Sequence, residues 1–317
     1  MFERTRHLAP RSRHRGHSPV RQLIWVRHRE LHRLPDRWRI STHYVGRMSA
    51  APPPHTDSVT LTALYDELDR AAGATDRVGA AGLPSLIEAL WNYLEAMAAE
   101  DPAMTHRHAR PAVLTLSNAT SSYFGARLRH TSDTARCDLP LLRMSVTTGR
   151  DEELGTPSVH EWIEAFELAL ICRNGPRDFY LRSQFHTMYH PNLWTPADAA
   201  ELRVPYAYAA ALSALLQRAR WPRNKDVKAA VAQLLPPALE RLAEAPADSA
   251  WLPRIRIIER LAAKKDISQE LADALRNPPR SRIAWPLLAL AALAHDQKLP
   301  AAIESDYLPS RFVDWKS

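Results

Sequence analysis

Apolar residues recur at helical spacing along most of the chain, which predicts a protein built from amphipathic helices. Between residues 59 and 68 they fall three or four positions apart, after a candidate N-cap at Asp57 or Ser58. Residues 83–99 carry the same pattern, and Pro111 opens a third segment of this kind. The first part of the chain is therefore expected to contain three helices.

A change of pattern separates these segments from the next helix. Residues 129–156 lose the helical spacing, and we expect mostly loop there, although residues 136–148 are apolar enough for a short strand. Thr156 and Pro157 then mark a helix start, because Thr caps a first turn and Pro needs no amide hydrogen bond at that position. The apolar residues that follow predict a helix that ends at residues 174–176, Asn-Gly-Pro.

The C-terminal half is predicted to be a series of helices joined by short loops marked by proline. Thr195 and Pro196 start a long alanine-rich helix that reaches Arg220, and the Pro pair at 236–237 is expected to interrupt the next one. Further helices are predicted for residues 177–189, 251–263, 267–276 and 283–295. The fold class is thus all-α: an irregular multi-helix bundle, whose helical pairs could stack as in a solenoid although the sequence shows no repeat period.

The formal net charge of the chain is +7, but its distribution divides the sequence in two. Residues 1–47 contain twelve Arg and three acidic residues and carry +9, whereas residues 48–317 carry −2. The first segment is too poor in apolar residues to offset ordering entropy, so we expect it to be disordered. It could be a nucleic-acid-binding arm, a targeting segment, or translated upstream sequence before a start at Met48, which we favour. Residues 48–317 are expected to form a single all-α domain.

The sequence lacks motifs for catalysis or cofactor binding. Nine Gly among 317 residues form neither a P-loop nor a GxGxxG loop, and the hydroxyl run at 120–122 lacks a nucleophile elbow. His186 and His190 have metal-ligand spacing, but no third ligand accompanies them. Cys137 and Cys172 are too few for a disulfide framework, and the longest apolar run, twelve residues, is too short for a membrane span. We therefore predict a cytoplasmic protein that is not an enzyme, with no catalytic residue, metal or cofactor, and with neither nucleic acid nor membrane as a partner.

Acidic residues indicate a binding surface more specifically than any other feature. Six carboxylates lie in or just before the helix predicted after Pro157: Asp151, Glu152, Glu153, Glu161, Glu164 and Glu167. Steps of three place the last three of them along one stripe of that helix. The stripe is either the solvated face of an amphipathic helix or an anionic docking surface for a basic partner.

Three segments of the chain carry a distinctive sequence. They are residues 160–173 (HEWIEAFELALICR), residues 250–255 (AWLPRI) and the C-terminal stretch 290–309, which ends in ESDYLP. These segments resemble the immunity protein 49 family of bacterial polymorphic-toxin systems. Six side chains match family positions: Trp162, Phe166, Arg173, Ser305, Asp306 and Tyr307. Such positions serve either structure or function, and Arg173 with Asp306 could form a buried ion pair that pins the C-terminus.

The resemblance implies an all-α cytoplasmic antitoxin that binds a cognate toxin domain, often a nuclease or a deaminase, and blocks it by occlusion. The acidic residues would suit the basic substrate cleft of such an enzyme. The sequence is also compatible with a homodimer. Two other functions stay open at this point: a TPR-like adaptor with a peptide groove lined by Tyr206, Tyr208 and Leu212, and a nucleic-acid binder that uses residues 1–47.

Overall fold

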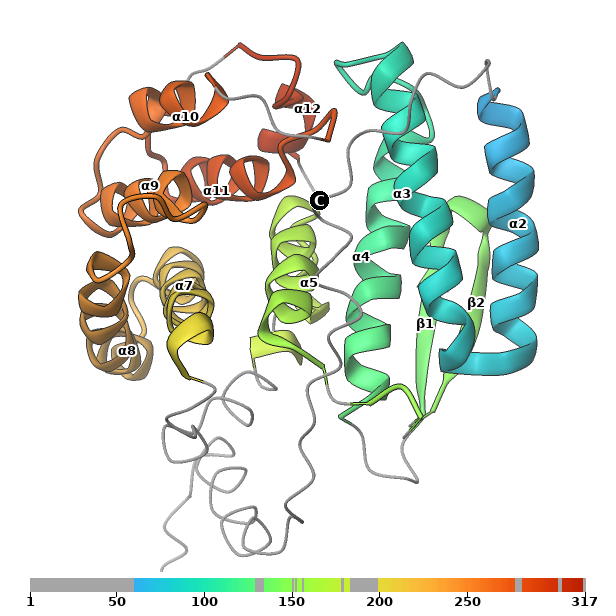
Figure 1. Ribbon diagram of the computed structural model, residues 1–317, viewed down its shortest axis with the longest axis horizontal. Coiled ribbons are helices and arrows are strands. Elements are labelled where there is room, and N and C mark those ends of the chain that lie inside the picture. Colours follow the sequence, from blue (N-terminus) through green and yellow to red (C-terminus); the bar gives the residue numbers. More distant parts are fainter. Residues whose placement is uncertain are drawn as a thin grey trace, which may run out of the picture. The chain divides into compact units, whose positions relative to one another are not determined.

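The computed structural model of the chain is predominantly helical, with one small two-stranded sheet among the residues that it describes (Figure 1), so the all-α prediction is confirmed. The predicted tail at 1–47, the His186 and His190 pair, and the helix start at Thr195 and Pro196 lie outside the described residues. The structure describes residues 60–128, 134–149, 151, 153–155, 157–177, 180–182, 199–276, 281–301 and 304–315.

Three successive helices pack as neighbours: α2 (Leu61–Val78), α3 (Leu83–Glu100) and α4 (Ala109–Ala126). Thr60 caps α2 with its hydroxyl, which accepts the amide hydrogen of Ala63, so the helix begins later than the sequence pattern indicated. A 3-10 turn, η2 (Gly79–Gly82), joins α2 to α3. Gly82 allows this close return, because a Cβ at that position would lie 2.6 Å from the Cα of Thr75.

A β-hairpin follows α4 where the sequence predicted mostly loop. Its strands β1 (Ala135–Leu139) and β2 (Met144–Thr148) are antiparallel, with Cys137 opposite Val146, and the 3-10 turn η3 (Pro140–Leu142) joins them. The side chains alternate between buried and exposed only over five residues per strand, a signal too short to separate from loop. The amide of Asn118 on α4 donates to the carbonyl of Asp138 at 2.9 Å, which holds the hairpin against that helix.

Helix α5 (Val159–Ile171) packs between α4 on one side and α7 and α11 on the other (Figure 1). It begins two residues after the predicted start at Thr156 and Pro157, because Ser158 and Glu161 form a capping box. The Ser158 hydroxyl accepts from the Glu161 amide at 3.3 Å, and the Glu161 carboxylate accepts from the Ser158 amide at 2.6 Å. Ten of the thirteen residues of α5 are buried, so this helix is part of the core.

Helices α7 (Ala199–Arg220) and α8 (Lys225–Ala243) pack against each other. The predicted interruption at Pro236 and Pro237 is wrong, because α8 passes through both residues. Both proline rings are exposed, and so are Ala232 and Gln233, whose carbonyls lose their amide partners to the prolines. Water can therefore satisfy these carbonyls without a break in the helix.

The buried side of α7 rules out the peptide groove that the sequence allowed. Tyr208 and Leu212 are completely buried, and Tyr206 packs against the same core with part of its surface exposed. These side chains fill the interior of the bundle, so they are not free to line a concave binding face.

Four further helices complete the described chain: α9 (Leu252–Ala262), α10 (Ser268–Leu275), α11 (Trp285–Asp296) and α12 (Ser310–Val313). The first three lie within two residues of their predicted bounds. Nine of the twelve residues of α11 are buried, which explains its nearly uninterrupted apolar sequence as that of a core helix. Across the described residues, no helix is both long enough and apolar enough to cross a membrane.

Candidate functional site

The carboxylates predicted to form a stripe on α5 each meet a different part of the interior. Glu161, besides capping its own helix, forms an ion pair with Arg127 at 2.7 Å, and little of either side chain is exposed. The guanidinium of Arg127 also lies over the ring of Tyr123, 4.3 Å from its centroid. Glu161 therefore joins α5 to the C-terminal end of α4.

Glu164 is a partly buried carboxyl group without a cationic partner among the described residues. It accepts a hydrogen bond from the indole Nε1 of Trp91 at 3.3 Å. Burial, followed by the charges of Glu161 and Glu167, raises the pKa of Glu164 from 4.5 to about 7 despite that hydrogen bond. The folded state thus holds this proton more tightly than the unfolded state, so the stability that Glu164 contributes is present below pH 4.5 and is lost as the pH rises towards 7.

Glu167 points towards α7 and α9, and only 5% of it is exposed. It accepts a hydrogen bond from the Tyr208 hydroxyl at 2.9 Å, and a nitrogen of Arg254 lies 3.9 Å from the same oxygen. Burial raises the pKa of Glu167, while Arg254 and Tyr208 favour its charged form. The expected surface stripe is therefore wrong, because Glu167 is almost completely buried between helices and Glu164 is only partly exposed beside Trp91.

The acidic segment before α5 is described only in part. Glu153 is exposed, and its amide donates to the Asp151 carboxylate at 3.1 Å, which forms a local turn. The amide of Asp151 donates to the carbonyl of Ala126 at the end of α4. Glu152 lies outside the described residues. A role of this segment in partner binding stays a prediction.

The aromatic residues of the α5 motif belong to the core. Trp162 and Phe166 are buried and stack on each other, with ring centroids 4.5 Å apart and an interplanar angle of 19°. The indole nitrogen of Trp162 donates to the carbonyl of Leu181 at 2.8 Å, which satisfies its only polar atom. Both rings thus lie in the core of the bundle.

Arg173 holds the C-terminal helices together, but not through the predicted partner. Its guanidinium forms an ion pair with Asp296 on α11 at 3.2 Å, and it donates to the carbonyl of Phe312 on α12 at 2.7 Å. It also donates to the carbonyls of Ala292 and Val313. The predicted pair with Asp306 is wrong, because Asp306 is exposed and Asp296 occupies the position beside the guanidinium.

The other two C-terminal motif residues shape a turn. The Ser305 hydroxyl accepts from the amide of Tyr307 at 3.2 Å, and the carbonyl of Tyr307 accepts from the amide of Ala284 at 2.9 Å. This turn holds the chain that follows α11 against the N-terminal end of that helix. Ser305 and Tyr307 therefore fix the path of the C-terminal segment.

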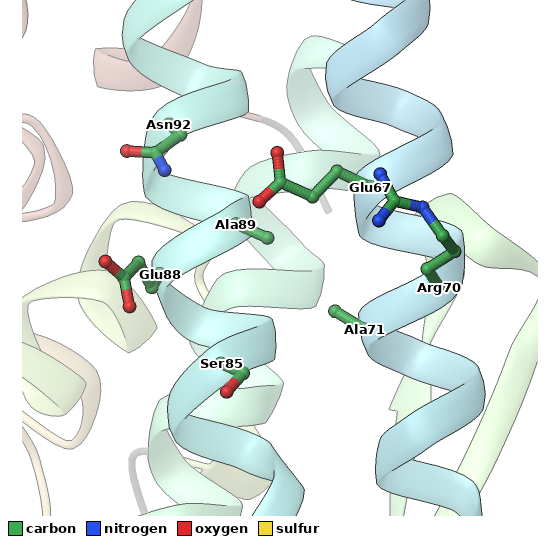
Figure 2. A pocket seen from close by; sticks show the side chains of 7 residues that line it. All are labelled: Glu67, Arg70, Ala71, Ser85, Glu88, Ala89 and Asn92. Atoms are coloured by element: carbon green, nitrogen blue, oxygen red, sulfur yellow. The ribbon is translucent and has the colours of Figure 1, made fainter.

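A groove between α2 and α3 is the open surface feature that the sequence analysis missed. Its volume is about 460 Å³. It is lined by Glu67, Arg70, Ala71, Ser85, Glu88, Ala89 and Asn92. Figure 2 shows Glu67 extending from α2 towards α3, with the small side chains of Ala71 and Ala89 between the two helices.

Exposed charge on α2 and α3 is mainly negative. The two helices expose six carboxylates, which we call the acidic face: Asp66, Glu67, Asp69, Asp76, Glu88 and Glu100. Arg70 and Arg77 are the basic residues that they expose, and α3 contains no Lys, Arg or His. That absence from an eighteen-residue helix was visible in the sequence. The apolar period of the two segments identifies their core side but does not show that their exposed carboxylates lie on neighbouring helices.

The polar groups described above serve the structure of the bundle or line the open groove. The interior carboxylates serve helix capping, ion pairing and hydrogen bonding, and the open groove combines acidic, amide and hydroxyl groups with one guanidinium. In the part of the chain that the structure describes, no group of three or more His, Cys, Asp or Glu side chains could hold a metal ion. Fold and surface together define a helical protein with an open, mainly acidic surface on α2 and α3.

The comparisons with known proteins agree with this class. The chain matches the family described as immunity protein 49 over residues 84–312, and it belongs to that family. The family suggested by the three sequence segments is thereby confirmed. The matched region runs from α3 into α12, and α2 precedes it. Neither the curated proteins nor the solved structures gave a match. The family gives the chain a general immunity role and implies a toxin as its partner.

Proposed function

We propose that this chain neutralises one cognate toxin of a polymorphic-toxin system by binding the toxin and occluding its active surface. Membership of the immunity protein 49 family over residues 84–312 is the observation that carries this proposal. The family resemblance implies a nuclease or a deaminase as the toxin. We infer the cytoplasm as the site of action, because the nucleic acids that such a toxin would attack are found there.

The placement of charged side chains supports occlusion as the mechanism. Glu161 is paired with Arg127, and Arg173 with Asp296, so these groups stabilise the protein itself. The carboxyl group of Glu164 is held against Trp91 inside the bundle. An exposed acidic surface could instead speed the approach of a basic toxin and orient it on the immunity protein. Asp151 and Glu153 would extend such an interface if the toxin reaches the loop before α5.

Growth of cells that produce the neighbouring toxin tests this function. The open reading frame next to the gene for this chain is expressed from an inducible promoter, with and without co-expression of the full chain. We expect growth arrest by the neighbour alone and normal growth with the chain. A Trp162→Asp variant provides the control, because a carboxylate in place of this buried ring should prevent folding and rescue. Persistent arrest in the presence of the intact, soluble chain would refute the proposal.

A further inference from the structure

We infer that the acidic face of α2 and α3 is the docking surface for a cationic region of the toxin, with the groove beside Glu67 receiving a Lys or Arg side chain. This inference rests on the proposed function and specifies where the toxin binds. Three features of the described residues support it: an edge helix, a groove of suitable size, and an excess of exposed negative charge.

Helix α2 forms an edge of the described structure. It packs against α3, η2 and β2, and its other side faces away from the bundle (Figure 1). The acidic residues Asp66, Asp69 and Asp76 all lie exposed on this helix. Among the described residues, no element covers this side of α2, so a partner can approach it without displacing any of them.

The groove between α2 and α3 provides a recess within this open surface. Ala71 and Ala89 are small, which leaves space between the helices where longer side chains would fill it (Figure 2). The volume of about 460 Å³ lies in the range of roughly 300–1,000 Å³ that is usual for ligand pockets. The recess could thus accommodate an extended basic side chain, and the carboxylate of Glu67 would be its ion-pair partner.

The charge of the lining residues favours a cation. Glu67 and Arg70 are three positions apart on α2, yet they form no ion pair with each other, in contrast to Glu161 with Arg127. The carboxylate of Glu67 is thus available for a guanidinium or ammonium group of a partner. Arg70 and the amide of Asn92 add groups that could bind a carboxylate or a backbone carbonyl beside that cation. Such mixed polar groups would fix orientation, while Glu67 and the exposed aspartates of α2 select a basic partner.

Hydrogen–deuterium exchange locates the docking surface directly. The full chain is measured alone and in complex with the toxin encoded by the neighbouring gene. We expect slower exchange at surface-facing amides of α2 and α3 in the complex. Slower exchange confined to other helices, such as α8 and α9, would overturn the inference and leave the proposed function intact. A toxin that does not bind the chain at all would overturn both.

Charge reversal then tests the chemistry of the surface. Glu67→Lys combined with Glu88→Lys should weaken toxin binding at least tenfold, and should reduce the loss of affinity with increasing salt. The control combines Glu240→Lys with Glu244→Lys, at exposed positions of the last turn of α8 and its C-cap, which changes the net charge equally and should leave affinity within twofold. Equal effects of the two double variants would overturn the inference, since only overall charge would then matter.

Folding and competing occupants are separated by two further measurements. Circular dichroism and thermal unfolding must be the same for both double variants; if the lysine variant unfolds, the Gln versions of Glu67 and Glu88 replace it, with an expected loss of about threefold. The acidic face could also be covered by another part of the chain or by a second copy. In that case, amide exchange on α2 and α3 would be slow in the free chain and fast in the charge-reversed double variant. That result would also overturn the inference.

Discussion

Replacing Arg173 with Met should destabilise the protein strongly, because this guanidinium joins α5 to α11 and α12. It donates to the Asp296 carboxylate and to carbonyls of both C-terminal helices, and only 10% of its side chain is exposed. Breaking a buried ion pair by removing one partner costs about 3–5 kcal/mol. Because Asp296 is 26% exposed and can be partly hydrated after the loss, we expect the lower end, about 3 kcal/mol.

Urea unfolding followed by circular dichroism measures this loss. Arg173 has a φ of +50°, and Met retains both the Cβ and that backbone strain, so the substitution removes the guanidinium without relieving the strain. A loss of about 3 kcal/mol corresponds to a fall of about 6–12 °C in Tm for a domain of this size. Arg256→Met is the matched control, because Arg256 is exposed on α9, and it should change stability by less than about 0.5 kcal/mol.

A double-mutant cycle identifies the partner of Arg173. Asp296→Asn combined with Arg173→Met should show a coupling of about 1–2 kcal/mol, because each change removes the same ion pair. Asp306→Asn should show no coupling with Arg173→Met. A loss below about 1 kcal/mol for Arg173→Met, or coupling through Asp306 and not Asp296, would contradict the role assigned to this residue.

Three other substitutions, one of them with a matched control, test local interactions. Glu164→Gln should raise the free energy of unfolding by about 2 kcal/mol at pH 8 and change it little at pH 5. The reason is the raised pKa of Glu164, which makes its charged form, present at the higher pH, unfavourable in the folded state. Equal effects at the two pH values would contradict this. Gly82→Ala should cost more than about 2 kcal/mol by steric overlap with Thr75, whereas Gly73→Ala inside α2 should be neutral or stabilising. Ser158→Ala should cost about 1 kcal/mol by removing half of the capping box, which thermal unfolding would detect.

Helix positions were predictable where a strong apolar period coincided with clear end signals. The predicted segments 251–263, 267–276 and 283–295 lie close to α9, α10 and α11. Where two candidate helix starts are adjacent, the sequence pattern alone does not show which of them begins the helix. Pro157 suggested the start of α5, but the reciprocal hydrogen bonds of Ser158 and Glu161 place it two residues later. Helix α8 also continues through its proline pair, because the carbonyls that lose their amide partners are exposed to water.

Exposure of charged residues was harder to predict than helix position. Spacing placed Glu161, Glu164 and Glu167 on one stripe, but spacing alone does not distinguish solvent from a neighbouring helix. Because α5 has helices on several sides, the stripe meets Arg127, Trp91 and Tyr208 in turn. The partners come from α4, α3 and α7, so no local pattern could indicate them. The acidic face on α2 and α3, in contrast, was accessible from the charge of those two segments.

The central claim, neutralisation by binding, is tested most directly by the stoichiometry of inhibition. Purified toxin from the neighbouring gene is incubated with increasing amounts of the full chain, and the remaining toxin activity is measured together with the mass of the recovered toxin. If the chain acts by occlusion, toxin activity should fall linearly with the amount of chain added and reach zero at a fixed molar ratio of chain to toxin. The toxin should remain chemically unchanged. Complete loss of activity at a small fraction of that amount, or a change in the mass of the toxin, would instead show catalytic inactivation and contradict the account.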